Sequence, residues 1–416
     1  MNPHRVILCL RGGVGGVDVF SCNLIRELLN RGVDSKIILT TSAREFIPSD
    51  IPVDELPIQK KEGWPSRWRK MIRYLENQAP CIFIPNYDFN YSCISPKLSE
   101  KIIIVGIVHS DEENYYADTK RLGKYWNGVV AVSQTIRDHL ISRNGFVLKS
   151  LATIPYGVPV PQVIPERKAR PDSPLRIVYV GRLVQMQKRI FDLPDILAQL
   201  NQRNVKAEIT IIGDGGQRVE LLQRLESFLA SGQVQYLGAL RNDQVLQNLE
   251  NQDVILLTSE YEGMPICILE AMSRGCIPIV TAIRSGIPEL VQDGYNGFVV
   301  GIGDAAAFAD RIGLLSRDLT LRRLTSSRAA QTIAERFNIQ KMTDEYLQFF
   351  QSLQKQMDRG DFQRPKNQIL IPPDLNLSWK QYLPASVRRL GIHSRRFFRK
   401  ITGTKPVRLA KKKGSR

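Results

Sequence analysis

The stretch VILLTSEYEGMPICILEAMSRGCIPIVT, residues 254–281, contains a strand, a polar loop, a helix and a second strand in close succession. Its two ends, VILLT and IPIVT, are short continuous apolar runs, which are typical of parallel strands covered by helices on both faces. Pro265 suits the first turn of the helix between them, where a missing N–H leaves nothing unsatisfied. The stretch therefore predicts one strand–helix–strand unit of a parallel α/β sheet.

Similar apolar runs occur in both halves of the chain. Further strands of the second half are predicted at RIVYV (176–180), EITII (208–212) and VQYL (234–237). The first half contains RVILCL (5–10), SKIILT (35–40), CIFIP (81–85), KIIIVGIVH (101–109) and GVVAVS (128–133). We therefore expect an α/β fold of two doubly wound Rossmann-like domains that face each other across a cleft, where ligands bind beyond the carboxyl ends of the strands.

The expected boundaries follow from changes in composition. A polar, proline-rich linker at 163–174 separates an N-terminal domain, residues 1–162, from a second domain, residues 175–335. A further helical pattern at 336–356 places Met342 and Tyr346 on one apolar face, and we expect this helix to pack back on the N-terminal domain. Residues 357–416 are expected to form a basic tail.

The composition is that of a globular protein in a reducing compartment. The chain has 416 residues, 43% hydrophobic and 24% charged, and its six cysteines are scattered without a C-x-x-C pair. This pattern favours neither a disulfide framework nor a zinc site. The N-terminus lacks a signal-peptide pattern, and the longest apolar run, near 102–108, is too short to cross a bilayer. We expect a cytoplasmic protein.

The net charge of +17 is concentrated at the C-terminus. After Asp374, the last acidic residue, come 13 basic residues, which leaves +4 for residues 1–374. The segment SWKQYLPASVRRLGIHSRRFFRK, residues 378–400, mixes these charges with large apolar side chains and suits an anionic membrane surface. A solvated extension is the plainer alternative. Nucleic acid is the least favoured partner, because no nucleic-acid-binding fold precedes the tail.

Two short segments, together with the pair of glutamates described next, predict a phosphate-binding cleft. The loop GGVGG, with Gly12, Gly13, Gly15 and Gly16, follows the first strand and precedes a helix, where a backbone can approach a phosphate. It is not a dinucleotide fingerprint, which would need a glycine in place of Asp18, and a tight structural turn would explain it as well. In VGRLVQMQKR, Arg182 and Lys188 follow a strand, and two cations there can neutralise a diphosphate; two ordinary surface cations are the alternative.

The strongest signal is the pair Glu262 and Glu270. Glu262 lies in the loop before the helix, and Glu270 lies about 7.5 Å further along the helix from Pro265 at 1.5 Å per residue. The helix N-terminus between the two carboxylates is a site for an anionic phosphate. Two solvated glutamates at a helix start remain the alternative for such a loose spacing.

These segments together resemble the family-4 retaining glycosyltransferases of GT-B architecture. Glu262 and Glu270 match the E-x7-E motif of that family, and Arg182 and Lys188 match its G-R-L…K segment. The resemblance covers residues 5–350 and leaves the tail outside. It extends to the following segments in the family's order: the G-G loop, the H-x-D of VGIVHSDEENYY, AVSQTIRDHL, IPYGV, IIGDGG, LGAL and SGIPELVQDGYNGFVV.

The resemblance implies a role for each matching residue. Arg182 and Lys188 would hold the donor diphosphate, Glu270 the ribose hydroxyls, and Glu262 the transferred sugar. The residues expected to line the phosphate and sugar are Gly13 from the N-terminal domain, Gly263, Met264 and Ile266 from the second domain, and His109 beside the reacting sugar. For His109, a buried structural histidine is the alternative. No D-x-D motif occurs, so we expect no metal and no cofactor, with a nucleotide-diphosphate sugar as the donor substrate.

The function that we predict is a retaining hexosyltransferase-like enzyme of surface glycan assembly. It would move a sugar from a nucleotide-diphosphate sugar to a glycan or lipid-linked acceptor, on the inner face of the membrane. Acceptor choice is expected from aromatic residues of the N-terminal domain: Tyr87, Tyr91, Tyr115, Tyr116 and Trp126. The alternative is a GT-B-fold binding protein without transferase activity that acts through its basic tail on a membrane or nucleic acid.

Overall fold

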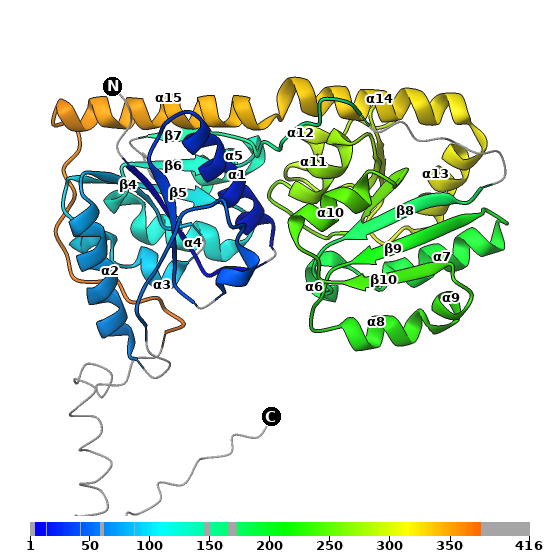
Figure 1. The fold of residues 1–416 in the computed structure, drawn as a ribbon, viewed down its shortest axis with the longest axis horizontal. Coiled ribbons are helices and arrows are strands. Elements are labelled where there is room, and N and C mark those ends of the chain that lie inside the picture. Colours follow the sequence, from blue (N-terminus) through cyan, green and yellow to red (C-terminus); the bar gives the residue numbers. More distant parts are fainter. Residues whose placement is uncertain are drawn as a thin grey trace, which may run out of the picture.

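The computed structural model describes residues 5–375, apart from residues 14, 42, 59–61, 87, 145–149 and 165–172. In this part of the chain two parallel α/β domains lie next to each other, as Figure 1 shows. The predicted fold class, two doubly wound domains, is therefore confirmed. Most of the predicted linker at 163–174 lies outside the described residues.

The N-terminal sheet has the strand order β3-β2-β1-β4-β5-β6-β7, and its strand pairs are parallel. The runs predicted from the sequence form its inner strands, and β5 is buried along its whole length. The two edge strands, β3 and β7, were not predicted. The strands are β1 (Arg5–Leu10), β2 (Ser35–Leu39), β3 (Val53–Glu55), β4 (Cys81–Ile84), β5 (Ile102–Val108), β6 (Gly128–Ala131) and β7 (Leu151–Thr153).

Helices connect these strands. The first of them buries Phe20, Leu24 and Leu28 on one face, at the spacing that the sequence shows. It ends just before Gly32, whose φ of +75° is a left-handed conformation that glycine adopts without strain. The helices are α1 (Gly16–Asn30), α2 (Trp64–Gln78), α3 (Phe89–Ser92), α4 (Glu113–Leu122) and α5 (Gln134–Asn144).

The C-terminal sheet has the order β10-β9-β8-β11-β12-β13 and is also parallel. Its strands are β8 (Leu175–Val180), β9 (Ala207–Ile212), β10 (Val234–Gly238), β11 (Val254–Leu257), β12 (Ile277–Thr281) and β13 (Phe298–Val300). Its helices are α6 (Gln185–Lys188), α7 (Asp192–Gln202), α8 (Arg218–Arg224), α9 (Glu226–Ala230), α10 (Asn242–Leu249), α11 (Ile266–Ser273), α12 (Ile287–Leu290), α13 (Ala305–Arg317) and α14 (Leu319–Arg336).

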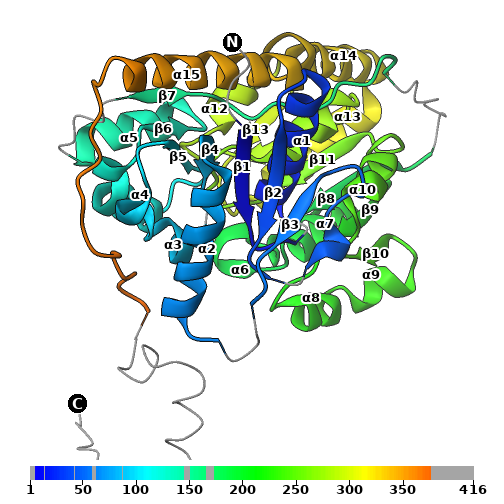
Figure 2. The same ribbon diagram turned by 60° about the vertical axis from the view of Figure 1, so that its left-hand side comes forward.

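The chain then returns to the N-terminal domain. The helix predicted at 336–356 is α15 (Ile339–Asp358), which packs against α1 and carries Phe349 close to Gly128 of β6. Figure 2 shows α14 and α15 running in succession along one side of both domains. The two connections between the domains lie side by side, because Val158 donates to the Phe337 carbonyl and accepts from the Ile339 N–H, both at 3.0 Å.

Residues 359–375, which we name the strap, continue from α15 along the N-terminal domain. The strap is drawn in orange in Figure 1 and descends from the end of α15. Arg364, 5% exposed, donates to the carbonyls of Leu98, Ser99, Ile102 and Tyr125. The prediction that a tail begins at residue 357 is therefore wrong in its boundary, because buried hydrogen bonds make residues 357–375 part of the folded body. Residues 376–416 lie outside the described residues.

Among the described residues, none of the helices combines the length and the apolar character that a membrane span needs.

Candidate active site

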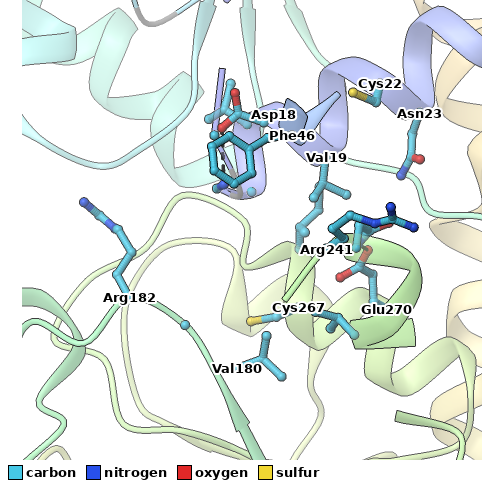
Figure 3. A pocket seen from close by; sticks show the side chains of 18 of the residues that line it. Asp18, Val19, Cys22, Asn23, Phe46, Val180, Arg182, Arg241, Cys267 and Glu270 are labelled. Carbon is cyan, nitrogen blue, oxygen red and sulfur yellow. Dashed lines mark hydrogen bonds between the residues drawn. The ribbon is translucent and has the colours of Figure 1, made fainter. Parts of the chain in front are cut away.

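A cavity of about 900 Å³ lies between the two domains. It opens at the carboxyl ends of strands from both sheets, where the loops after β1, β5, β8 and β11 meet. Figure 3 shows this cavity at close range, with residues of α1 on one wall and residues of the C-terminal domain on the other. This is the position at which doubly wound sheets bind ligands.

Glu262 lies in the loop between β11 and α11, where the sequence places it. Glu262 is 7% exposed, and its carboxylate forms an ion pair with the Lys188 ammonium. It also accepts a hydrogen bond from Ser259 Oγ at 2.7 Å. Thr258 Oγ1 donates to the Lys188 carbonyl at 2.7 Å, which ties the end of α6 to this loop. The structure thus brings Glu262 and Lys188, 74 residues apart in sequence, into direct contact.

Arg182 follows β8 and lines the same cavity. Its guanidinium donates to the side-chain oxygen of Gln187, which is buried beside Lys188. In Figure 3, Arg182 lies on one side of the cavity and Glu270 on the other. The two predicted cations therefore line one cavity from neighbouring positions, and Arg182 is the more exposed of the two.

Glu270 is buried in the second turn of α11, with 3% of its surface exposed. One carboxylate oxygen accepts from Asn242 Nδ2 at 2.7 Å. Burial raises the pKa of the Glu270 carboxyl to about 7, although the Asn242 hydrogen bond and the charge of Arg274 act to lower it. A buried carboxylate on a cavity wall accepts hydrogen bonds and donates none when it is ionised, which suits the hydroxyls of a sugar ring.

The backbone of Gly263 comes close to the N-terminal domain. A Cβ atom at Gly263 would lie 2.0 Å from the His109 carbonyl oxygen, which no side chain could tolerate. Beside it, Ser133 and Ser285 hydroxyls pair across the domains at 2.9 Å, and Gln134 N–H donates to the Glu289 carboxylate at 2.7 Å. Gly263, Met264 and Ile266 line the cavity at the N-terminus of α11. Pro265 precedes the first residue of this helix as its N-cap, one position earlier than the sequence suggested.

The glycine loop lies on the opposite wall. Gly13, Gly15 and Gly16 line the cavity, and Gly16 lies close to Ile266, with its Cβ position 3.8 Å from that side chain. The Gly15 N–H donates to the Asp18 carboxylate at 3.2 Å. The N-termini of α1 and α11 thus meet at the cavity from the two domains, and both present backbone N–H groups.

His109 lies at the end of β5 on the cavity wall, and both of its ring nitrogens have partners. Asn86 donates through Nδ2 to the Cys9 carbonyl at 3.2 Å, so its Oδ1 accepts from His109 Nε2 at 3.0 Å. The Tyr156 hydroxyl then donates to His109 Nδ1 at 2.5 Å. Burial lowers the pKa of this imidazole to about 3, and the ring is neutral at physiological pH.

Several cavity residues were not predicted from the sequence. They come from the α1 face, the turn after β2 and the start of α10: Cys22, Asn23, Arg26, Arg44, Phe46, Asp50, Arg241 and Asn242. Phe46 is 45% exposed although it is large and apolar. None of these belongs to a recognisable motif, and the LGAL segment just before Arg241 was the nearest signal.

The aromatic residues expected to choose the acceptor fall into two groups. Tyr115 lines the cavity. The prediction is wrong for Tyr91, Tyr116 and Trp126, which are buried in the core of the N-terminal domain. Their large apolar surfaces serve packing, as most buried aromatic side chains do. Tyr87 lies outside the described residues.

Within the described ranges, no cluster of three or more His, Cys, Asp or Glu side chains is placed to hold a metal ion. That the reaction needs no metal or cofactor stays a prediction.

Two facing Rossmann-like domains with a cavity between them, lined by these motifs, define the GT-B glycosyltransferase class. Residues 14–161 match the family model Glycosyltransferase Family 4, and residues 162–332 match the model Glycosyl transferases group 1. The chain belongs to the family-4 glycosyltransferases, as the resemblance at Glu262 and Glu270 predicted.

Individual curated relatives match this chain over only part of its length. N-acetyl-alpha-D-glucosaminyl L-malate synthase of Bacillus anthracis is 31% identical over 159 residues, 38% of this chain and 41% of that protein. Lipopolysaccharide core biosynthesis glycosyltransferase LpsE of Rhizobium meliloti (strain 1021) is 30% identical over 181 residues, 44% of this chain and 51% of that protein. The chain thus spans about half the length of these curated relatives.

Solved structures resemble most of the chain. The Anabaena protein HepE, in complex with UDP and glucose, superposes with a TM-score of 0.70 at 18% identity. The match covers 84% of this chain and 100% of that one. At this identity the likeness shows the fold.

Proposed function

We propose that the protein transfers a sugar from a nucleotide-diphosphate sugar to a glycan or lipid-linked acceptor, with retention of the anomeric configuration and without a metal ion. The observation that carries the proposal is the composition of one cavity wall. That wall combines two cations, a helix N-terminus and a buried carboxylate: Arg182, Lys188, the first turn of α11 and Glu270. These are the groups that a diphosphate and a ribose require.

The diphosphate lies at the N-terminus of α11 in this proposal. The first N–H groups of a helix have no partner within the helix, and its dipole favours a negative charge there. Arg182 and Lys188 supply full positive charge to the leaving diphosphate, which is the electrostatic work that a divalent cation performs in other transferases. Lys188 already lies in the cavity because its ion pair with Glu262 holds it there.

The sugar lies between Glu262 and the end of β5. Glu262 accepts hydrogen bonds from sugar hydroxyls, and the acceptor oxygen attacks the anomeric carbon from the side of the leaving phosphate. The bond from the anomeric carbon to the phosphate oxygen breaks, and that oxygen takes the proton of the acceptor hydroxyl. His109 is neutral with both ring nitrogens engaged, so its part in this scheme is to shape the wall and not to transfer a proton.

The acceptor approaches from the N-terminal domain. Phe46 and Tyr115 give this wall aromatic surface that a sugar ring or a lipid can cover. The name of one relative, LpsE, refers to lipopolysaccharide core biosynthesis, which supports an acceptor of the cell envelope. The basic segment 376–416 would hold the enzyme against an anionic membrane on the cytoplasmic side.

The first test is a binding screen of the purified full chain against UDP-, GDP-, ADP- and TDP-sugars, observed through the ligand NMR signals in the presence of EDTA. We expect selective binding of one nucleotide class. The bound donor is then incubated with candidate acceptors, and the anomeric configuration of the product is read from its NMR coupling constants. An inverted product would contradict retention, and the absence of binding to every donor would contradict the whole proposal.

A further inference from the structure

The C-terminal domain supplies the predicted donor motifs, but α1 of the N-terminal domain also faces the cavity. Val19, Cys22, Asn23 and Arg26 line it, and their spacing places them on one face of the helix. This face is opposite α11, because the start of α1 packs against Ile266. Of these residues, Asn23 combines a polar side chain with near-complete burial, at 5% exposed.

In the Asn23 amide, the carbonyl oxygen has a hydrogen-bond partner and the NH₂ group has none among the described residues. Arg26 Nη1 donates to Asn23 Oδ1 at 3.4 Å. A guanidinium has no acceptor, so the amide cannot be turned the other way without placing two donors together. Asn23 Nδ2 is buried and has no hydrogen-bond partner among the described residues. A buried donor without a partner is unusual and requires an explanation.

Arg26 is itself fixed by a second pair. Its Nε donates to Asp50 Oδ2 at 2.6 Å, and its Nη2 donates to Asp50 Oδ1 at 3.1 Å. This two-bond arrangement fixes the plane of the guanidinium. The Arg26 guanidinium also lowers the pKa of the Asp50 carboxyl, which keeps the pair ionised. Asp50 and Arg26 therefore hold the Asn23 carbonyl oxygen and leave its NH₂ group aimed into the cavity.

Figure 3 shows what lies on the far side. Asn23 extends from α1 into the cavity, toward the side on which Arg241 and Glu270 lie. An ionised Glu270 only accepts hydrogen bonds, so a hydroxyl that donates to it keeps free lone pairs on its own oxygen. A hydroxyl in that position needs a donor from another direction, and Asn23 Nδ2 is an unused donor on the opposite wall.

We infer that Asn23 donates a hydrogen bond to a ribose hydroxyl of the bound nucleotide, so that the N-terminal domain also recognises the sugar of the nucleoside. The inference rests on the proposed function, because it requires the ribose to lie at Glu270. It adds a specificity-determining residue from the acceptor-side domain. Asn23 rejects nucleotides that lack the matched hydroxyl, because its donor and Glu270 then both lose a partner.

The test is a cycle of protein and ligand changes on the full chain. The dissociation constants of UDP, GDP and ADP, and of their 2′-deoxy and 3′-deoxy forms, are measured by calorimetry for wild type and Asn23→Ala. For wild type we expect one deoxy form of the bound nucleotide to bind about tenfold more weakly than the ribonucleotide. In Asn23→Ala we expect the ratio of the two dissociation constants, deoxy form over ribonucleotide, to be about threefold to tenfold smaller than in wild type. This is the size of one neutral hydrogen bond.

Matched controls separate this effect from damage to the helix. Asn30→Ala changes the same residue type at the exposed end of α1, away from the cavity, and should leave the ratio unchanged. Asn23→Asp keeps the shape of the side chain without its donor and should lower the ratio as Asn23→Ala does. An unchanged ratio for both deoxy forms in both variants, with UDP, GDP or ADP still bound, would overturn the role of Asn23 alone. If none of the ribonucleotides binds wild type, the proposed function and this inference both fall.

Discussion

Glu270 illustrates how a buried carboxylate on a cavity wall can oppose stability. Its carboxyl is buried with a pKa raised to about 7, whereas an exposed glutamate titrates near 4.5. The folded protein therefore binds a proton that the unfolded chain releases between these values. The contribution of Glu270 to the free energy of unfolding therefore falls as the pH rises from 4.5 to 7, and it stays low above pH 7.

The direction of this change in stability with pH gives a first prediction. Glu270→Gln should raise the free energy of unfolding at pH 8 by about 1–3 kcal/mol, because a neutral amide replaces a buried charge. The gain should shrink as the pH falls toward 4.5 and vanish below it, where the native glutamate is protonated in both states. The same variant should weaken nucleotide binding at least tenfold, because ribose hydroxyls lose an ionised acceptor. Urea unfolding at pH 5 and pH 8 with calorimetry checks both effects, and a loss of stability at pH 8 would contradict the argument.

Lys188 and Glu262 form a nearly buried ion pair, and changes to its two side chains give a second prediction. Both side chains are nearly buried, so a change at one leaves the other charge without its partner. Lys188→Met should lower the free energy of unfolding by about 3 kcal/mol. Adding Glu262→Gln should restore most of that loss, because the stranded charge is then removed.

The double variant should still fail to bind the donor diphosphate, since a positive charge is missing. Chemical unfolding measures the recovery of stability, and calorimetry with the donor measures binding. Tight donor binding by Lys188→Met/Glu262→Gln would show that Lys188 only balances Glu262 and takes no part in holding the diphosphate.

At the scale of elements, the loop between β11 and α11 joins the two domains at Gly263. Gly263→Ala would place a methyl group 2.0 Å from the His109 carbonyl oxygen and 2.7 Å from its carbon, so the backbones must move apart. We expect a loss of stability of about 1–3 kcal/mol. Turnover should fall more than tenfold, because the same shift moves Glu262 and the start of α11.

Gly216→Ala is the matched control for this prediction. A Cβ at Gly216 would have no heavy atom within 4 Å, and its backbone has no positive φ. Gly263→Ala should therefore unfold at a lower temperature and give a lower initial rate than Gly216→Ala. If Gly263→Ala is as stable and as active as Gly216→Ala, the two domains tolerate separation at this contact.

Periodicity in the sequence predicted the long elements and missed the short ones. The inner strands of the N-terminal sheet are continuous Ile and Val runs, which only a sheet covered on both faces can bury. The edge strands Val53–Glu55 and Leu151–Thr153 have three residues each, too few to show any period. They exist because β2 and β6 offer an unpaired edge.

The site divides in the same way. Arg182 and Glu262 follow strands within motifs, so their common position at one end of the sheet could be predicted. Asn23 could not, because in sequence it is an ordinary polar position of an amphipathic helix. The role inferred for it depends on a cavity formed by a second domain and on Asp50, 27 residues away, holding Arg26 beside it. Contacts of this kind leave no local pattern.

At the scale of the whole molecule, the strap holds the last described residues against the N-terminal domain. Arg364 donates to carbonyls that come 239 to 266 residues earlier in the chain, and burial lowers the pKa of its guanidinium to about 10. Leu370 pairs through its N–H with the Cys93 carbonyl at 3.1 Å, and its own carbonyl accepts from Arg121. The described chain therefore ends at Leu375 against the N-terminal domain, and the 13 basic residues follow that end in sequence.

This arrangement predicts that membrane binding and donor binding can be separated. A chain ending at Leu375 keeps the whole strap, so it should bind nucleotide as the full chain does. It should lose flotation with vesicles of one-third anionic lipid, because each basic residue near such a surface contributes about 1 kcal/mol. Full-length flotation should vanish with neutral vesicles and near 1 M salt, where the Debye length falls to about 3 Å.

Arg364→Ala in the full chain is the control, since it should lower stability and still float. Equal flotation of the full and shortened chains would show that another surface holds the protein to the membrane.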